Sequence, residues 1–154
     1  MPGTYSQVYL QVVFAVQGRD NLIAKSWKED LNKYISGIIT NKGQKSIIVN
    51  GMRDHIHAFI GLKPSMAVSD LVRDIKNNSS KFINKNRFVK GKFSWQKGYG
   101  VFSYSHSHIE QVYNYILNQE KHHRKRTFKE EYIEFLHKFQ IEYDEQYLFE
   151  WIDR

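Results

Sequence analysis

Two separated segments with alternating side chains constrain the fold of this chain most. In residues 5–16, every second side chain is apolar and would share one face of a β-strand: Val8, Leu10, Val12, Phe14 and Val16. In residues 55–62, Ile56, Ala58, Ile60 and Leu62 alternate in the same way with His55, His57 and Phe59. Because successive side chains of a strand point to opposite faces of a sheet, both segments predict strands with one strongly buried face.

Helical patterns separate these strands. Ser26 and Glu29 have the spacing of a capping box, and apolar residues then recur at helical intervals until Gly43, which suits a helix C-terminus. Residues 47–49 predict a short strand. Asn50-Gly51 is a tight-hairpin signal, although the paired strands could begin a little later.

The second half of the chain has a similar order. Pro64-Ser65 is expected to open a second helix, and residues 93–103 predict a strand interrupted by its glycines. Ser107 and Glu110 form another capping-box pattern at the start of a third helix, which ends in a basic run. A further cap at Thr127 starts a shorter helix.

The resulting order is strand, helix, strand, strand, helix, strand, helix. It predicts an α+β fold of the ferredoxin-like, split β-α-β type. In this fold, an antiparallel four-stranded sheet carries helices on one face, here with a C-terminal helical extension. A chain of 154 residues is expected to form one such domain.

The charges are unevenly distributed along the chain. Residues 1–127 hold 20 basic and 8 acidic side chains, whereas residues 128–154 hold 3 and 8. A basic body points to a polyanionic partner, and the 15% aromatic content would suit stacking on unpaired bases. Composition alone fits a soluble protein of high pI equally well. Without cysteine, a signal sequence or an apolar run of membrane length, the chain is expected in the cytoplasm, with no disulfides and no membrane association.

His55 and His57 lie two residues apart in a predicted strand, so their imidazoles would point the same way. Their Cα atoms would be roughly 6.6–6.8 Å apart, a spacing from which two imidazoles can converge on one metal ion. Their face is opposite the one that the helices should cover. We therefore expect an open face that a substrate can reach, although such a pair taken alone is more often structural or simply exposed.

The third predicted helix carries an apolar stripe of Ile109, Val112, Tyr113, Ile116 and Leu117. Tyr113 is therefore expected to pack in the core. Tyr115 lies instead on the polar face, one turn before Gln119, where its hydroxyl would be available for reaction. An ordinary, partly exposed tyrosine would have the same spacing. A tyrosine becomes a covalent nucleophile when a base, a metal ion or a positive field activates it.

Gln119 could complete a metal site with the two histidines. Its amide oxygen would be a third ligand beside two neutral imidazoles, and a metal ion there could draw charge from a phosphate oxygen. Imidazoles suit zinc and other transition ions, while amide and water oxygens suit magnesium or manganese. The residues alone therefore leave the ion open.

Four segments resemble one known family, the single-tyrosine HUH transposases of bacterial insertion sequences and their relatives associated with repetitive extragenic palindromes (REPs). Asp54-His55-Ile56-His57 is similar to the family's His-hydrophobic-His strand, and Tyr115-Ile116-Leu117-Asn118-Gln119 is similar to its Tyr-x-x-x-Gln helix. Residues 74–81 and 95–100 also resemble family segments. The resemblance covers roughly residues 5–123, and four segments in the family's order are a strong signal.

The resemblance implies the predicted fold and a reaction on single-stranded DNA. Tyr115 would attack the scissile phosphate, leaving a 5′-phosphotyrosyl link and a free 3′-hydroxyl. A 3′-hydroxyl from another strand would reverse this step and join the DNA. His55, His57 and Gln119 would hold Mg²⁺ or Mn²⁺. The family works as a homodimer on DNA ends that contain hairpins.

Basic side chains are the expected DNA contacts: Arg19, Lys76, Lys81, Arg124, Lys125 and Arg126. The basic run at the end of the third helix would also complement the helix dipole. By the same resemblance, residues 1–126 would form the HUH transposase catalytic domain. Residues 127–154 would form a C-terminal helical and acidic extension of that domain.

Two alternatives stay open. A domesticated, REP-associated nickase would keep the chemistry without mobility, and nothing in the chain separates it from the transposase of a mobile element. A non-catalytic module that binds single-stranded nucleic acid would use a similar sheet with exposed aromatic side chains. If the chain were such a module, the spacing of His55, His57 and Gln119 would be a coincidence without a function.

Overall fold

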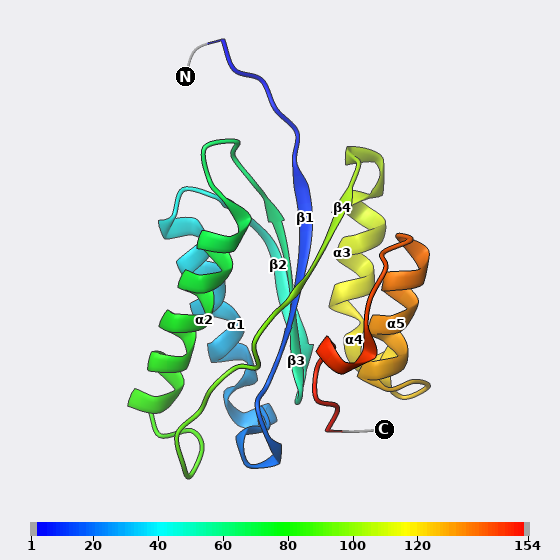
Figure 1. Ribbon diagram of the computed structural model, residues 1–154. Helices are drawn as coiled ribbons and strands as arrows, with labels where there is room; N and C mark the ends of the chain where they lie inside the picture. Colours follow the sequence, from blue (N-terminus) through cyan, green and yellow to red (C-terminus); the bar gives the residue numbers. More distant parts are fainter. Residues whose placement is uncertain (1–2, 153–154) are drawn as a thin grey trace.

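β1 (Tyr9–Ala15) lies inside a four-stranded antiparallel sheet in the computed structural model, which describes residues 3–152 (Figure 1). The sheet order is β2-β3-β1-β4, with β2 spanning Lys45–Met52, β3 His55–Gly61 and β4 Gly100–Tyr104. The helices are α1 (Lys25–Asn41), α2 (Val68–Lys85), α3 (Ile109–Leu117), α4 (Gln119–His123) and α5 (Phe128–Lys138). The predicted split β-α-β arrangement is confirmed, since β3 lies between β1 and β2.

Helices α1 and α2 cover one face of this sheet, and α3, α4 and α5 lie on the other side of it (Figure 1). On the first face, side chains from β1 and β3 pack with both helices, among them Val12, Phe14, Ile56, Ala58, Leu31 and Ile75. Alternation along the strands produces this face, as predicted. None of the helices described in residues 3–152 is long and apolar enough to cross a membrane.

The second face is buried as well. Val13, Ala15 and Phe102 pack there against the apolar side of α5 and the chain that follows it, in a cluster with Phe128, Tyr132, Phe135, Leu136 and Phe149. The expectation that the first strand has a single buried face was therefore wrong. The C-terminal helices supply the second layer, which alternation in β1 alone does not reveal.

The N-terminal cap of α5 has the predicted form. The Glu130 backbone N–H donates to the Thr127 hydroxyl at 3.2 Å, and the Thr127 backbone N–H donates to the Glu130 carboxylate at 3.0 Å. The other two predicted capping boxes were wrong. Helix α1 follows Ala24 and α3 follows His108, and neither residue has a side-chain cap.

The hairpin between β2 and β3 turns later than Asn50-Gly51 suggests. Asn50 pairs with His57 and Gly51 with Ile56 inside the ladder, and the turn is formed by residues 53–54. This register sets Gly51 against the backbone of β3. A Cβ atom on Gly51 would collide with the His55 carbonyl oxygen and lie 2.9 Å from Ile56 Cα.

We therefore expect Gly51→Ala to lower the free energy of unfolding by about 1–3 kcal/mol, as overpacking usually does. Urea or thermal denaturation would measure this change. Gly37→Ala is the matched control, because Gly37 lies in α1, where an added Cβ atom would meet no neighbouring element within 4 Å. That control should gain about 0.5–1 kcal/mol from helix propensity. Equal effects at the two positions would contradict the packing described for Gly51.

Candidate active site

His55 and His57 lie on the second face of β3, with ring centres 4.9 Å apart. Both side chains are fully buried. His55 stacks on Phe128 of α5, and His57 meets the ring of Phe135 edge-on. The expected open face was therefore wrong, because the same C-terminal helix that completes the core also covers the two histidines.

Hydrogen bonds behind the rings orient both imidazoles. His55 Nδ1 lies 2.7 Å from Asp54 Oδ1, and His57 Nδ1 lies 2.6 Å from Gln11 Oε1. An acceptor oxygen at each Nδ1 keeps a ring proton there, so each Nε2 is directed toward the centre of the site. Metal-binding histidines in proteins are held in this way, and the pair therefore fits a divalent cation.

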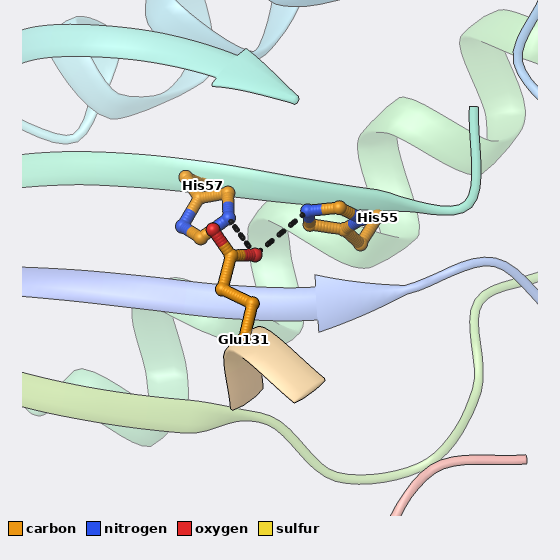
Figure 2. A group of neighbouring side chains, drawn as sticks. All are labelled: His55, His57 and Glu131. Carbon is orange, nitrogen blue, oxygen red and sulfur yellow. Dashed lines mark hydrogen bonds and ion pairs between the residues drawn. The ribbon is translucent and has the colours of Figure 1, made fainter. Parts of the chain in front are cut away.

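Glu131 of α5 points its carboxylate between the two histidines (Figure 2). Glu131 Oε1 lies 3.1 Å from His57 Nε2, 3.3 Å from His55 Nε2 and 3.1 Å from His123 Nε2. The ligand atoms of His55, His57 and Glu131 all lie within 4.8 Å of one another. This separation is small enough for one metal ion to bind all three residues.

The protonation of the cluster follows from burial and from these contacts. Burial acts to lower the pKa of His55, but its hydrogen bonds with Asp54 and Glu131 outweigh burial and raise the pKa to about 9. Burial lowers the pKa of His57. Burial acts to raise the pKa of Glu131, but the neighbouring histidines hold it well below its usual range. Glu131 is therefore a carboxylate at neutral pH, and a proton on His55 competes with a metal ion for Nε2.

Gln119 lies at the site, as the sequence predicts for a ligand. Its Oε1 atom is 3.2 Å from His55 Nε2, and its Nε2 donates to Glu131 Oε2 at 3.1 Å. Gln119 begins α4 and is fully buried. The predicted third helix is divided at Asn118, so that Tyr115 and Gln119 belong to consecutive helices.

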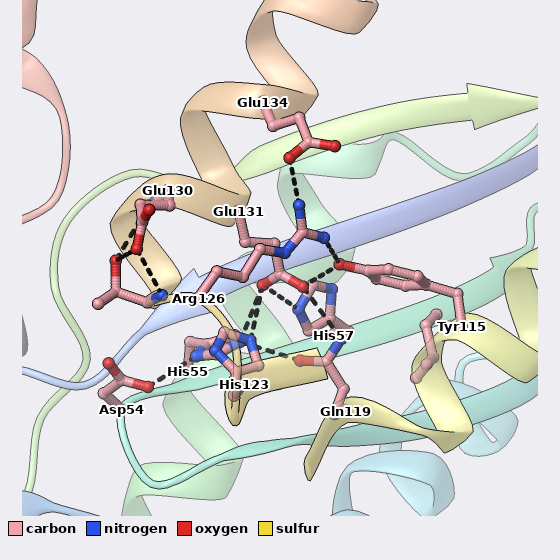
Figure 3. A network of polar contacts seen from close by, with 12 residues as sticks. Asp54, His55, His57, Tyr115, Gln119, His123, Arg126, Glu130, Glu131 and Glu134 are labelled. Carbon is pink, nitrogen blue, oxygen red and sulfur yellow. Dashed lines mark hydrogen bonds and ion pairs between the residues drawn. The ribbon is translucent and has the colours of Figure 1, made fainter. Parts of the chain in front are cut away.

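Tyr115 lies beside the same carboxylate (Figure 3). Its hydroxyl donates to Glu131 Oε2, and Arg126 Nη2 donates to the Tyr115 oxygen at 2.5 Å. Burial first, and then the charge of Glu131, raise the pKa of Tyr115 well above its usual range, while Arg126 acts in the opposite direction. The hydroxyl is therefore protonated at neutral pH, with the hydrogen directed at a carboxylate.

The surroundings of the two tyrosines of α3 differ from the prediction. Tyr115 is half-buried, with its ring stacked on His122 at 4.4 Å, whereas Tyr113 is 38% exposed. The inner side of α3 and α4 is formed by Val112, Tyr115, Ile116 and Gln119, which also have helical spacing. Tyr113 was thus wrongly placed in the core, because α3 packs on the sheet through Val112 and Ile116, which cluster with Phe59 of β3.

Gln11 also donates to the Tyr104 hydroxyl at 2.9 Å, so it is held while it orients His57. We expect Gln11→Leu to weaken Mn²⁺ binding by roughly 10–100-fold, the usual cost of losing an outer-shell partner of a metal ligand. Isothermal titration calorimetry would measure the affinity. Gln7→Leu, an exposed position that precedes β1, is the control. Equal affinities for the two variants would mean that the Gln11 bond does not orient the imidazole.

The basic side chains predicted to contact DNA have different surroundings. Arg19 donates to Ile152 O at 2.7 Å, and Lys76 donates to Gln96 O and Gly98 O at 2.9 and 2.6 Å. Burial lowers the pKa of Lys76 to about 8. These two cations bind backbone carbonyls of their own chain, whereas Lys81 is exposed on α2.

Arg124, Lys125 and Arg126 border an open cleft of about 390 Å³ beside the buried cluster. Asp54 and His123 also line this cleft, so that it leads toward the histidines. Arg124 and Lys125 are exposed. Arg126 instead reaches the Tyr115 hydroxyl and Glu134. The basic run thus supplies both a cationic rim and a direct contact to Tyr115.

Glu131 is the principal residue that the sequence interpretation missed. A signal for it exists in α5, where Phe128, Glu131, Tyr132 and Phe135 have the spacing of one helix face. A glutamate on an otherwise apolar stripe is unusual, since buried glutamates are almost always paired. The supporting role of Gln11 has no comparable signal, because it depends on strand register, whereas Asp54 is the residue directly before His55.

The chain is similar to known transposases. The family described as "Transposase IS200 like" matches residues 4–119. The ISDra2 transposase TnpA of Deinococcus radiodurans is 21% identical over 122 residues, which cover 76% of this chain and 87% of that protein.

Two solved structures share the fold. One is a protein assigned as a transposase from Deinococcus radiodurans R1, with a TM-score of 0.62, 22% identity, and coverage of 77% of this chain and 95% of that one. The other is a REP-associated tyrosine transposase bound to a REP hairpin, with a TM-score of 0.59, 13% identity, and coverage of 80% and 73%.

Proposed function

The chain belongs to the IS200-like family of HUH transposases, and we propose that it nicks and rejoins single-stranded DNA through a 5′-phosphotyrosyl intermediate. One observation carries this proposal. The Tyr115 hydroxyl, the Nε2 atoms of His55 and His57 and the side chain of Gln119 all converge on the carboxylate of Glu131. A nucleophile and a candidate metal site thus lie side by side, although they come from distant parts of the sequence.

In the proposed reaction, the Tyr115 oxygen attacks the scissile phosphorus. The bond from Tyr115 to phosphorus forms as the bond to the 3′-oxygen breaks. The Tyr115 proton passes to Glu131 Oε2, to which the hydroxyl donates, and the released 3′-oxygen takes up a proton, so that protons balance. Attack by another 3′-hydroxyl reverses these steps, so no nucleotide hydrolysis is needed. Arg126, which already donates to the Tyr115 oxygen, is placed to stabilise negative charge there.

His55, His57 and Gln119 would hold Mg²⁺ or Mn²⁺, and their orientation in the structure supports this assignment. A bound ion would supply Lewis-acid polarisation of a phosphate oxygen. The hydrogen bonds to the oxygens of Asp54 and Gln11 hold the two rings in place, so that the imidazoles themselves need not reorient when a phosphate arrives.

We propose that the DNA backbone approaches along the cleft lined by Arg124, Lys125 and Arg126, whose cations suit phosphates. Lys81 is a further candidate contact on the opposite side of the sheet, on α2. Arg19 and Lys76 would have to leave carbonyl partners in order to bind DNA. A hairpin substrate is proposed by analogy with the relative that is bound to a REP hairpin.

We also propose a homodimer and a single domain. Leu117 and Tyr113 are 52% and 38% exposed on α3, and this apolar outer side supports a contact between subunits.

Residues 1–126 would be the catalytic part, with residues 127–154 as an extension of the same domain. The packing of α5 against β1 and β4 supports the proposal that both parts form one domain.

The test is covalent attachment to DNA. The protein would be incubated with labelled single strands from the DNA that flanks its gene, with Mn²⁺ or Mg²⁺ present, and then run on a denaturing gel. A slowed, metal-dependent protein band is the expected result. Tight DNA binding without any adduct would contradict the nicking activity and favour a binding module.

A further inference from the structure

We propose that Glu131 is a ligand of the metal ion, so that the site consists of His55, His57, Gln119 and Glu131. This inference deepens the proposed function, since it concerns the same metal site. Glu131 lies outside residues 4–119, the part of the chain that matches the family. The C-terminal extension would therefore supply one ligand of its own.

The first reason is how the polar atoms face one another. Glu131 Oε1 is 3.1 Å from His57 Nε2 and 3.3 Å from His55 Nε2 (Figure 2). The acceptors behind the rings keep a proton on each Nδ1. For His57, a neutral imidazole with that proton presents a lone pair at Nε2, which would oppose the lone pairs of a carboxylate, whereas on His55 the ion would replace a proton at Nε2. A cation shared by the three atoms turns this opposition into attraction.

The second reason is the burial of a negative charge. The Glu131 carboxylate is fully covered, and imidazoles from His55, His57 and His123 face it. A buried charge is costly unless it is paired or bound to a metal. Two imidazoles, a carboxylate and an amide oxygen form a mixed nitrogen and oxygen set that Mn²⁺ and similar ions accept.

The two oxygens of Glu131 also connect the metal site with Tyr115. Oε1 faces the imidazoles, whereas Oε2 accepts from the Tyr115 hydroxyl and from Gln119 Nε2 (Figure 3). As a ligand, Glu131 would hold the hydroxyl at a constant position relative to the ion. It would also tie α5 to the sheet whenever the ion is bound.

The experiment measures Mn²⁺ binding by calorimetry in the full chain, without DNA. Glu131→Gln has nearly the same shape but lacks the charge. We expect it to bind Mn²⁺ more weakly by on the order of 10-fold or more, since even outer-shell partners change affinity by 10–100-fold. Mn²⁺ should also slow hydrogen exchange of the α5 amides in the unchanged protein and not in the variant. Glu142→Gln, an exposed position after α5, is the control and should match the unchanged protein.

An alternative role for Glu131 predicts the opposite change in Mn²⁺ affinity. If the carboxylate only occupies the place of the ion as a counter-charge for the histidines, Glu131→Gln will leave Mn²⁺ affinity unchanged or raise it. That outcome would overturn the proposal, as would the absence of Mn²⁺ binding by the unchanged protein. If Glu131→Gln does not fold, Glu131→Asp replaces it. This variant keeps the charge but withdraws it from Nε2, so undiminished affinity there would also refute the ligand role.

Because no DNA is present, this result is independent of strand cleavage. A protein that binds Mn²⁺ through Glu131 but forms no adduct with DNA would contradict the proposed nicking activity and leave the ligand assignment intact.

Discussion

Replacing Tyr115 with phenylalanine is expected to abolish covalent attachment to single-stranded DNA, with a loss of at least about 10³-fold, as for other removed nucleophiles. The variant loses one oxygen atom, which is the atom that accepts from Arg126 and donates to Glu131. Hairpin binding should stay nearly unchanged, because phosphate contacts by cations supply most of the affinity. A denaturing gel measures the adduct, and a filter-binding titration measures the affinity.

Tyr113→Phe is the matched control for that experiment. Tyr113 lies two residues earlier on α3, and it is more exposed than the half-buried Tyr115. Its variant should form the adduct at the normal rate. Persistent attachment by Tyr115→Phe together with loss in Tyr113→Phe would exchange the roles assigned to the two residues.

The second large effect is expected for His57→Ala, which should lower metal-dependent cleavage by at least about 100-fold. Even the loss of an outer-shell partner of a metal ligand lowers metal affinity or activity by about 10–100-fold. The substitution deletes the imidazole opposite Glu131 and leaves Gln11 Oε1 without its partner. Cleavage assays over a range of Mn²⁺ concentrations would measure the loss. Circular dichroism would confirm that the variant is folded, since a buried ring is removed.

His106→Ala provides the comparison for that variant. His106 is exposed in the turn before α3 and should be dispensable for cleavage. Full activity of His57→Ala in the presence of a chelator would refute a metal-dependent mechanism for this protein.

Strand order and the first helical layer were predictable from the sequence, because they follow from short-range periodicity. The alternation in β1 and β3 identifies the side chains that α1 and α2 cover. Capping boxes were less informative: only the one at Thr127 forms. The hairpin signal at Asn50-Gly51 was overridden, since β3 pairs with β2 through both residues.

The candidate site was predictable only in part, for a physical reason. The spacing of His55 and His57 and the turn between Tyr115 and Gln119 are local, and the structure does bring these four residues together. The residue that completes the site is Glu131, which is 74 positions from His57 in the sequence. Its place depends on how α5 packs on the second face, and spacing within one element cannot indicate that.

The order of these residues along the chain has a consequence for synthesis. Domains tend to fold as the chain emerges from the ribosome, N-terminal parts first. The two histidines emerge early, Tyr115 follows after β4, and Arg126 and Glu131 come later, just before and within α5. A nascent chain therefore lacks the carboxylate and guanidinium that surround the tyrosine. The centre therefore depends on α5, and a chain that stops before α5 would lack the Glu131 carboxylate beside Tyr115.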